Sequence, residues 1–152
     1  MEISKGDSNG SVETYDGNKV TLLRGDFFDV TESETNGRFH IIYDRASMVA
    51  IRPELRAQYV ETIGRLIQPG GSILFITVDR REGSDQAKMA GPPFSINEST
   101  VRTLYESTSW VESVTKLDEL DEFQNDPDSI KRWQSQGLTS LYELCFLIKA
   151  KL

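Results

Sequence analysis

The chain has 152 residues, of which 27% are charged and 38% are hydrophobic, and its formal net charge is −7 at pH 7. This length and apolar content suit one soluble domain with its own core. The acidic balance argues against a nucleic-acid partner, because binding to a phosphate backbone depends on clustered Lys and Arg. No apolar stretch approaches the roughly 20 residues needed to cross a bilayer, so we expect no membrane partner.

The amino end and the cysteine content predict a cytoplasmic location. Residues 1–11, MEISKGDSNGS, lack the basic start and apolar centre of a secretory signal. The single cysteine, Cys145, cannot form an internal disulfide and fits a reducing compartment. Residues 1–18 are polar, and we expect them to be poorly ordered, with the domain over residues 19–152. We predict no metal site.

Two strands and a helix are predicted in the first half of the domain. Residues 19–26, KVTLLRGD, read as a strand that ends in a turn, and residues 39–44, FHIIYD, read as a strand buried on both faces. A helix begins near Pro53 and repeats apolar residues on one face until the segment 68–71, QPGG, stops it.

The second half is predicted to hold three more strands and one helix. Residues 72–78, SILFITV, form the most apolar run and predict a central strand, which is followed by a charged loop over 79–93. Ser95 and Glu98 have the spacing of a capping box at the start of the next helix. Residues 110–117 and 141–148 predict the last strands, and the acidic segment 118–130 between them reads as a solvated loop.

This alternation predicts a largely parallel α/β sheet with right-handed crossovers, in which the last strand runs antiparallel. In such sheets ligands bind at the carboxyl ends of the strands. Asp26, Asp44, Arg45 and Asp79 all follow predicted strand ends, and we expect them to line one rim of the sheet.

Several motifs, in this order, resemble the thiopurine S-methyltransferase family over about residues 19–150. They are GDFFDV (25–30), YDRASMVAIRPELRAQYV (43–60), PGG (69–71), DQAKMAGPPFSI (85–96) and RWQSQGLTSLYELCFLI (132–148). The combination of YDRA with GPPF at this separation is the most specific part. The resemblance implies a Rossmann-like class I methyltransferase fold that uses S-adenosylmethionine to methylate the sulfur of a small aromatic or heterocyclic thiol.

The resemblance also implies roles for individual residues. Asp26 and Phe27 would meet the adenine of the cofactor, since a carboxylate accepts from the exocyclic amine and a backbone N–H donates to a ring nitrogen. Arg45 would contact both cofactor and substrate and favour the thiolate form of the sulfur. Arg132 and Pro93 of the GPPF turn would border the substrate. Methyl transfer needs in-line attack, so positioning is the main catalytic demand.

Each of these residues also has a structural interpretation. Asp26 would be a plain turn residue after Gly25, and Asp44 with Arg45 would be a local ion pair of little energetic worth. Arg132 would be a solvated charge, and GPPF a stiff loop without a ligand.

One feature of the family is absent from the sequence. Class I methyltransferases hold the methionine part of the cofactor on a glycine-rich turn after their first strand, and no such turn precedes GDFF. The sequence thus resembles roughly the carboxyl-terminal three-fifths of a family member, in which the two strands between residues 19–26 and 39–44 in the order 3-2-1-4-5-7-6 are missing.

The absence leaves alternative functions open. The predicted strand 39–44 would become an edge strand, which is prone to pairing with another chain. The chain is therefore either a methyltransferase given in truncated form, or a non-catalytic remnant or partner-completed fragment. A related methyltransferase of small thiols, halides or metalloids is the third interpretation. We expect a monomer when the domain is complete, and self-association through the edge strand in this form.

Overall fold

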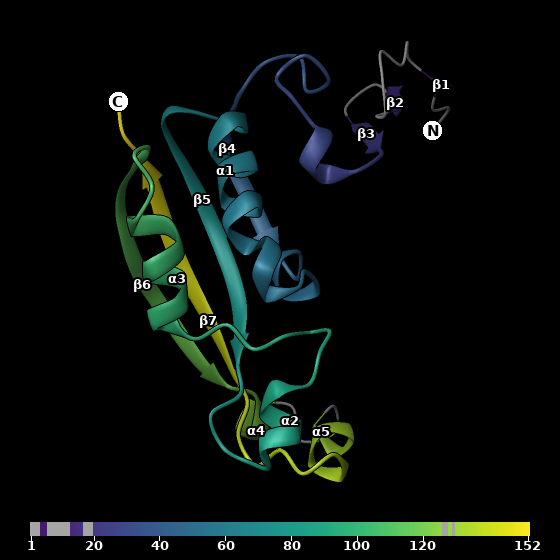
Figure 1. The fold of residues 1–152 in the computed structure, drawn as a ribbon, viewed down its shortest axis with the longest axis vertical. Coiled ribbons are helices and arrows are strands. Elements are labelled where there is room, and N and C mark those ends of the chain that lie inside the picture. Colours follow the sequence, from purple (N-terminus) through teal and green to yellow (C-terminus); the bar gives the residue numbers. More distant parts are fainter. Residues whose placement is uncertain (1–3, 6–12, 17–19, 126–127, 129) are drawn as a thin grey trace.

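The computed structural model describes residues 4–5, 13–16, 20–125, 128 and 130–152, which form two sheets and a set of helices (Figure 1). The strands are β1 (Ser4–Lys5), β2 (Glu13–Asp16), β3 (Thr21–Arg24), β4 (Phe39–Arg45), β5 (Ile67–Asp79), β6 (Val111–Asp121) and β7 (Tyr142–Ala150). The α-helices are α1 (Arg56–Leu66), α2 (Asp85–Met89), α3 (Glu98–Glu106), α4 (Glu122–Asn125) and α5 (Lys131–Ser135). Short 3₁₀ helices lie at Phe27–Asp29, Met48–Ala50 and Pro53–Leu55.

The main sheet has the strand order β4-β5-β7-β6. β4 pairs with β5 in parallel, whereas β7 is antiparallel to both β5 and β6. β4, β5 and β6 therefore share one direction and β7 opposes them. This arrangement confirms the predicted Rossmann-like α/β sheet with an antiparallel last strand.

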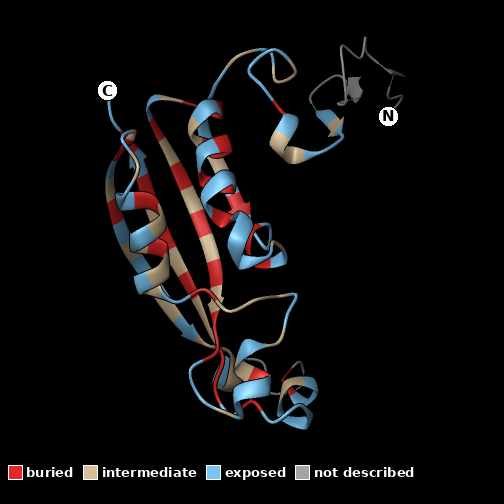
Figure 2. Cartoon of the chain, viewed as in Figure 1, coloured by how far each residue is buried: buried red, intermediate tan, exposed pale blue. Residues whose placement is uncertain are grey.

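The core lies on one face of this sheet, under α1 and α3. Every second residue of β5 is buried, and Ile73 and Phe75 are 1% and 0% exposed. Tyr105 of α3 places its ring 5.7 Å from that of Phe75, and Tyr59 of α1 hydrogen-bonds to β4. Both helices thus cover the same face, and buried and half-buried residues alternate along β5 (Figure 2).

The opposite face of the sheet is much more open. Ile41 and Tyr43 of β4 are 73% and 63% exposed, and Leu117 of β6 is 52% exposed. Between them, Leu74, Ile76, Cys145 and Leu147 are half-buried. β4 is also an edge strand of this sheet, because it pairs only with β5 among the described strands. We refer to this surface as the open face.

Strand β3 lies outside the main sheet. It pairs with β2, and β2 with β1, in a separate three-stranded antiparallel sheet. Within residues 1–18, which we expected to be poorly ordered, the structure describes two strands, and the other residues of that range lie outside the described ones. A short 3₁₀ helix after β3 packs Phe27 against α1 and so connects this part to the core.

The expectation that residues 39–44 are buried on both faces was wrong, because Ile41 and Tyr43 are exposed. Three other local expectations were also wrong. The second helix is capped by Asn97, whose Oδ1 accepts from the backbone N–H of Thr100 at 2.9 Å, whereas Oγ of the predicted cap Ser95 accepts from the backbone N–H of Arg80 at 2.9 Å. The loop over 79–93 contains helix α2. The acidic segment 118–130 begins with the last residues of β6 and with α4.

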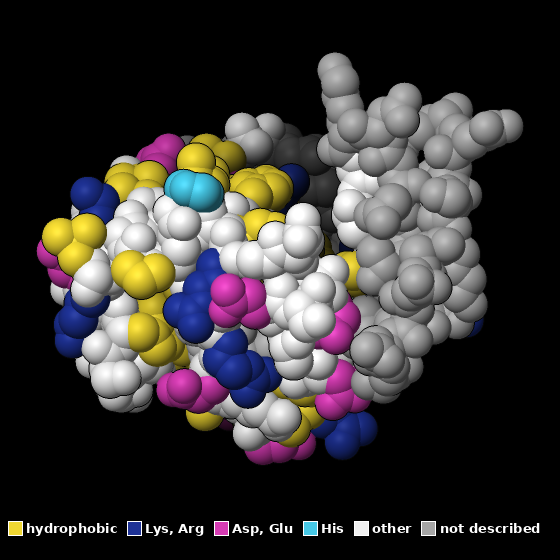
Figure 3. All heavy atoms as spheres, turned by 90° about the horizontal axis from the view of Figure 1, so that it is seen from above, with side chains coloured by type: hydrophobic (Ala, Val, Ile, Leu, Met, Phe, Trp, Pro, Cys, Tyr) yellow, Lys and Arg dark blue, Asp and Glu magenta, His cyan; other side chains and the backbone are white. Residues whose placement is uncertain are grey.

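The surface is mixed in character. On the end of the molecule where the C-terminus lies, hydrophobic side chains are interspersed with Lys, Arg, Asp and Glu (Figure 3). None of the described helices has the length and apolar character that a membrane span requires.

Candidate functional site

The carboxyl end of β4 directs two charged neighbours to opposite faces of the sheet. Asp44 pairs in register with Phe75 of β5 and is buried under the helices, at 3% exposed. Arg45 pairs with Ile76 and lies on the open face. Successive residues of a strand point to opposite faces. The buried carboxylate of Asp44 therefore anchors the strand end, while the guanidinium of Arg45 is accessible to a ligand on the open face.

The anchor is a hydrogen bond to α1. The hydroxyl of Tyr59 donates to Oδ2 of Asp44 at 2.8 Å, and Oδ1 is buried without a partner. Burial raises the pKa of Asp44, and the hydrogen bond from Tyr59 opposes this shift. Burial also raises the pKa of Tyr59, so that Tyr59 remains a donor at neutral pH.

The chain turns sharply just after Arg45. Ala46 has a φ of 67°, in the left-handed region that side chains with a Cβ rarely adopt. The turn leads into the 3₁₀ helix Met48–Ala50, where the backbone carbonyl of Val49 accepts from the N–H of Phe94 at 2.6 Å. This bond ties the end of β4 to the GPPF turn.

A pocket of about 450 Å³ opens on this part of the open face. Its lining consists of Tyr43, Arg45, Ala46, Val49, Ile76, Thr77, Val78, Pro93 and Glu143. Most of these side chains are apolar, with a few polar groups among them, which is the usual composition of a small-molecule site.

The charged groups of the pocket form an ion pair. Nη2 of Arg45 donates to Oε2 of Glu143 at 2.9 Å, and the two side chains are 56% and 26% exposed. This hydrogen bond and the negative charge of Glu143 raise the pKa of Arg45. Arg45 therefore stays cationic at all working pH values, with one of its donors already occupied.

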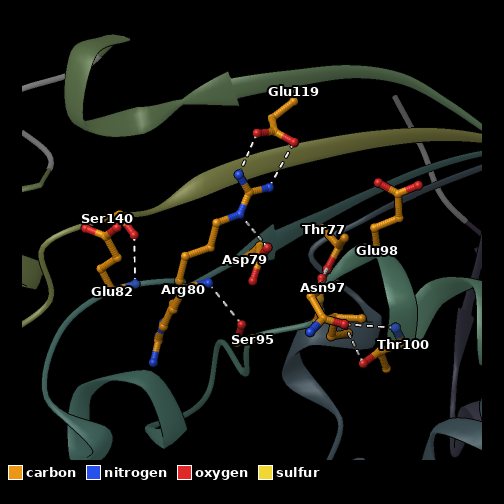
Figure 4. Close-up of polar contacts among 12 residues, drawn as sticks. Thr77, Asp79, Arg80, Glu82, Ser95, Asn97, Glu98, Thr100, Glu119 and Ser140 are labelled. Atoms are coloured by element: carbon orange, nitrogen blue, oxygen red, sulfur yellow. Dashed lines mark hydrogen bonds and ion pairs between the residues drawn. The ribbon is translucent and has the colours of Figure 1, made fainter.

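The wall of the pocket at Pro93 is held from behind by Arg80. This side chain is 4% exposed, and its guanidinium donates to the carbonyl oxygens of Ala87, Ala90 and Pro93. It also lies 4.6 Å from the ring centroid of Trp133 in α5. Figure 4 shows its backbone N–H bonded to Ser95, next to the cap at Asn97 and Thr100. The loop from α2 to Pro93 is thus fixed to the end of β5.

The structure brings together two of the residues predicted from the sequence. Arg45 and Pro93 both line the pocket. Asp26 and Phe27 do not line this pocket, and Oδ1 of Asp26 accepts from the backbone N–H of Phe28 at 3.0 Å. The ring of Phe27 lies 4.9 Å from the ring of Tyr59, and Tyr59 is the residue that hydrogen-bonds to Asp44.

Arg132 lies apart from the pocket lining. It is exposed on α5, and its guanidinium is 5.3 Å from the ring centroid of the adjacent Trp133. It contributes to the group of side chains around Trp133 rather than to the pocket around Arg45.

Sequence reasoning missed Glu143, although its position carried a signal. It is the one charged residue in the segment LYELCFLI, which otherwise reads as a buried strand. A charge inside such a run marks either an exposed edge or a place where the strand faces a polar site. Its partner, on a strand that is not adjacent to β7, could be found only from the sheet order.

Comparison with solved structures shows the fold class. The chain matches phosphoethanolamine N-methyltransferase 2 of Haemonchus contortus with a TM-score of 0.58 and 13% identity, covering 86% of this chain and 37% of that one. It matches an arsenic(III) S-adenosylmethionine methyltransferase of Chlamydomonas reinhardtii with a TM-score of 0.51 and 14% identity, covering 81% and 42%.

Curated relatives are more similar in sequence. A thiopurine S-methyltransferase of Aliivibrio salmonicida is 37% identical over 142 residues, which is 93% of this chain and 59% of the relative. One of Nitrosospira multiformis is 34% identical over 139 residues, which is 91% and 58%. The chain therefore spans about three-fifths of the length of these relatives. The family model for thiopurine S-methyltransferase matches residues 4–142, and the chain belongs to this family.

Proposed function

We propose that this chain is the carboxyl-terminal part of an S-adenosylmethionine-dependent methyltransferase that acts on the sulfur of a small aromatic or heterocyclic thiol in the cytoplasm. Family membership supports the reaction class. The observation that carries the proposal is the pocket of about 450 Å³, which Arg45 and Pro93 line together with apolar side chains. Such a pocket suits one or two aromatic rings with a single anionic atom.

Arg45 is the proposed catalytic residue. A guanidinium beside the sulfur favours the thiolate, because an opposite charge nearby stabilises the anion. The apolar side chains of Val49, Ile76 and Val78 would hold the ring, and Pro93 would limit its movement. Orientation of the sulfur toward the methyl donor is then the main contribution of the protein.

The residues fit one end of the cofactor. Asp26 is oriented by its bond to the N–H of Phe28, and a carboxylate with two oxygens retains capacity to accept from the exocyclic amine of adenine. The half-buried ring of Phe27 offers an apolar surface beside it. S-adenosylmethionine supplies the methyl group when bound. The sequence holds no glycine-rich turn for the methionine end, so we expect weak binding by this chain.

Calorimetric titration of the chain with S-adenosylmethionine, followed by methyl-transfer assays with thiophenol, tests the proposal. We expect heat of binding, and turnover that Arg45→Ala lowers by at least tenfold. Arg52→Ala, which removes an exposed arginine outside the pocket, is the matched control and should leave turnover unchanged. Absence of both heat and turnover at high protein concentration would refute the proposal for this chain.

The open face favours a second function, that of a fragment completed by another chain. β4 is a seven-residue edge strand with two strongly exposed apolar side chains. Such an edge is a template for strand pairing. We propose that the chain associates with a second copy through β4, and that sedimentation velocity will detect dimers which Ile41→Lys abolishes. A monomer at all concentrations would exclude this association.

Arg132 keeps its proposed role at the substrate only if its exposed guanidinium turns toward the pocket in the complete enzyme.

A further inference from the structure

We propose that Glu143 accepts the N–H of a heterocyclic thione, so that the pocket prefers substrates in which an N–H is directly bonded to the carbon that carries the sulfur. This inference rests on the proposed function and names the substrate chemistry of the same pocket. It arises from the ion pair between Arg45 and Glu143, which the assignment of Arg45 alone leaves unexplained.

The ion pair is built across a strand. Arg45 belongs to β4 and Glu143 to β7, and β5 lies between these strands. In register, Arg45 is beside Ile76 and Glu143 is beside Val78, so the two charged side chains approach each other over the apolar residues of β5. Ile76 and Val78 form part of the pocket lining beneath them. A ligand that lies on β5 therefore meets both charges at once.

A hydrogen-bond donor, Arg45, lies next to an acceptor, Glu143, so a ligand that bonds to both needs an acceptor atom next to a donor atom. Arg45 donates hydrogen bonds, and Glu143 accepts them. In an N–C=S unit the sulfur is the acceptor and the neighbouring N–H is the donor, so a thione can take over the partner of each side chain. A carbocyclic thiol offers only the sulfur. Binding of such a thiol would separate Arg45 from Glu143 and leave the carboxylate of Glu143 without a new hydrogen-bond donor. This loss is unfavourable, because the side chain of Glu143 is charged and only 26% exposed.

The same arrangement supplies a proton acceptor. The thione sulfur forms a bond to the methyl group, and the bond between that methyl group and the sulfonium sulfur of the cofactor breaks with its electron pair on that sulfur. The ring N–H proton moves to the carboxylate of Glu143. The products are a neutral S-methyl heterocycle, the neutral cofactor product and a protonated carboxyl group, so charge and atoms balance. Arg45 holds the sulfur throughout and does not lose a proton.

Binding of two isomeric thiones tests the inference without the need for turnover. Pyridine-2-thione has its N–H next to the carbon that bears sulfur, whereas pyridine-4-thione has it on the far side of the ring. We expect the wild-type chain to bind the 2-isomer about tenfold more tightly than the 4-isomer, as measured by the change in thione absorbance on titration. Glu143→Gln should bring the ratio to within about twofold, because an amide cannot bond the N–H as a charged oxygen does.

Two further variants control for indirect effects. Glu143→Asp keeps a carboxylate on a shorter side chain and should retain a preference for the 2-isomer. Glu112→Gln removes an exposed acid elsewhere on the surface and should leave the ratio unchanged. Circular dichroism of each variant checks that it is folded.

Equal binding of the two isomers by the wild type, no binding of either, or a preference that survives in Glu143→Gln would overturn the inference. The proposed function is decided separately, by methyl transfer to any of three substrates: thiophenol, which has no N–H, and the two thiones. A chain that methylates thiophenol but does not distinguish the thiones keeps the function and loses the role of Glu143. A chain that distinguishes the thiones without methyl transfer keeps the role in binding and loses the function.

Discussion

Tyr59 and Asp44 join α1 to the end of β4 through a 2.8 Å hydrogen bond that lies directly behind the pocket. Asp44 is the residue before Arg45, so the position of the catalytic candidate depends on how its neighbour is held. The bond also compensates one oxygen of a carboxylate that is almost fully buried. Three predictions follow from this end of the strand.

Tyr59→Phe removes the hydroxyl and leaves the buried carboxylate without this donor. We expect a loss of about 1–3 kcal/mol in the free energy of unfolding, measured by urea denaturation. Tyr43→Phe removes an exposed hydroxyl from the same sheet and should change stability by less than about 0.5 kcal/mol. Equal losses of unfolding free energy in the two variants would show that the hydrogen bond to Asp44 contributes no more than an exposed hydroxyl does.

Asp44→Asn should stabilise the chain at neutral pH. Burial raises the folded-state pKa of Asp44 above its unfolded value, so the native state favours the protonated form. The stability of the folded wild type is highest, as far as Asp44 is concerned, below the unfolded-state pKa of this carboxyl group. That stability is lost as the pH rises through the higher folded-state pKa. The variant should therefore gain stability relative to the wild type as pH increases from acidic to neutral values. A stability difference that does not change with pH would refute this explanation.

Ala46→Gly should relieve backbone strain in the turn after Arg45. A left-handed conformation costs a residue with a Cβ about 1–2 kcal/mol, whereas glycine adopts it freely. We expect a net gain of about 1 kcal/mol in thermal or urea unfolding. Ala57→Gly, at an exposed position inside α1, should instead lose about 0.5–1 kcal/mol. If Ala46→Gly lost stability as Ala57→Gly does, the strain would be absent.

Arg80→Met should loosen the wall of the pocket. The substitution keeps an apolar stem but removes the donors to the carbonyl oxygens of Ala87, Ala90 and Pro93. We expect faster hydrogen exchange over residues 85–95 and a loss of about 2–4 kcal/mol in unfolding free energy. Arg52→Met, on an exposed arginine, serves as the control. Unchanged exchange in this loop would mean that its other contacts hold it without Arg80.

Glu119 provides a test of the ion pairs on the other side of the sheet. Hydrogen bonds from Arg81, with a further one from Lys116, lower the pKa of Glu119 to about 2. Its contribution to stability is present above the unfolded pKa and is lost as pH falls through about 2. Glu119→Gln should cost about 1 kcal/mol at pH 7, and this difference should shrink as the pH is lowered. A cost that persists at low pH would point to packing rather than charge.

The parts of the fold that depend on local pattern could be predicted from the sequence. The run SILFITV became the central strand β5, and the apolar repeat after Pro53 became α1. Helix α2 could not be predicted, because its C-terminal end is held by the guanidinium of Arg80, just after β5, which donates to the carbonyl oxygens of Ala87 and Ala90. The wrong cap has the same origin, since the backbone N–H of Arg80 takes the hydroxyl of Ser95.

The candidate site was predictable only where the family motifs reach. Arg45 and Pro93 follow from YDRA and GPPF, and the structure places both at one pocket. Glu143 depends on the crossing order of β4, β5 and β7, which no short motif encodes. The position of Phe27 next to Asp26 depends on the contact of its ring with Tyr59 of α1, which is distant in the sequence.

The two tryptophans of the chain lie at opposite ends of the main sheet. Trp110 precedes β6 and packs edge-on against Tyr105, with ring centroids 6.1 Å apart. Trp133 lies beyond the other end of β6, with the guanidinium groups of Arg80 and Arg132 4.6 Å and 5.3 Å from its ring centroid. Each indole therefore has its own quenching environment, one aromatic and one cationic. Emission from single-tryptophan variants will report separately on the two ends, and will reveal whether they melt together or in sequence.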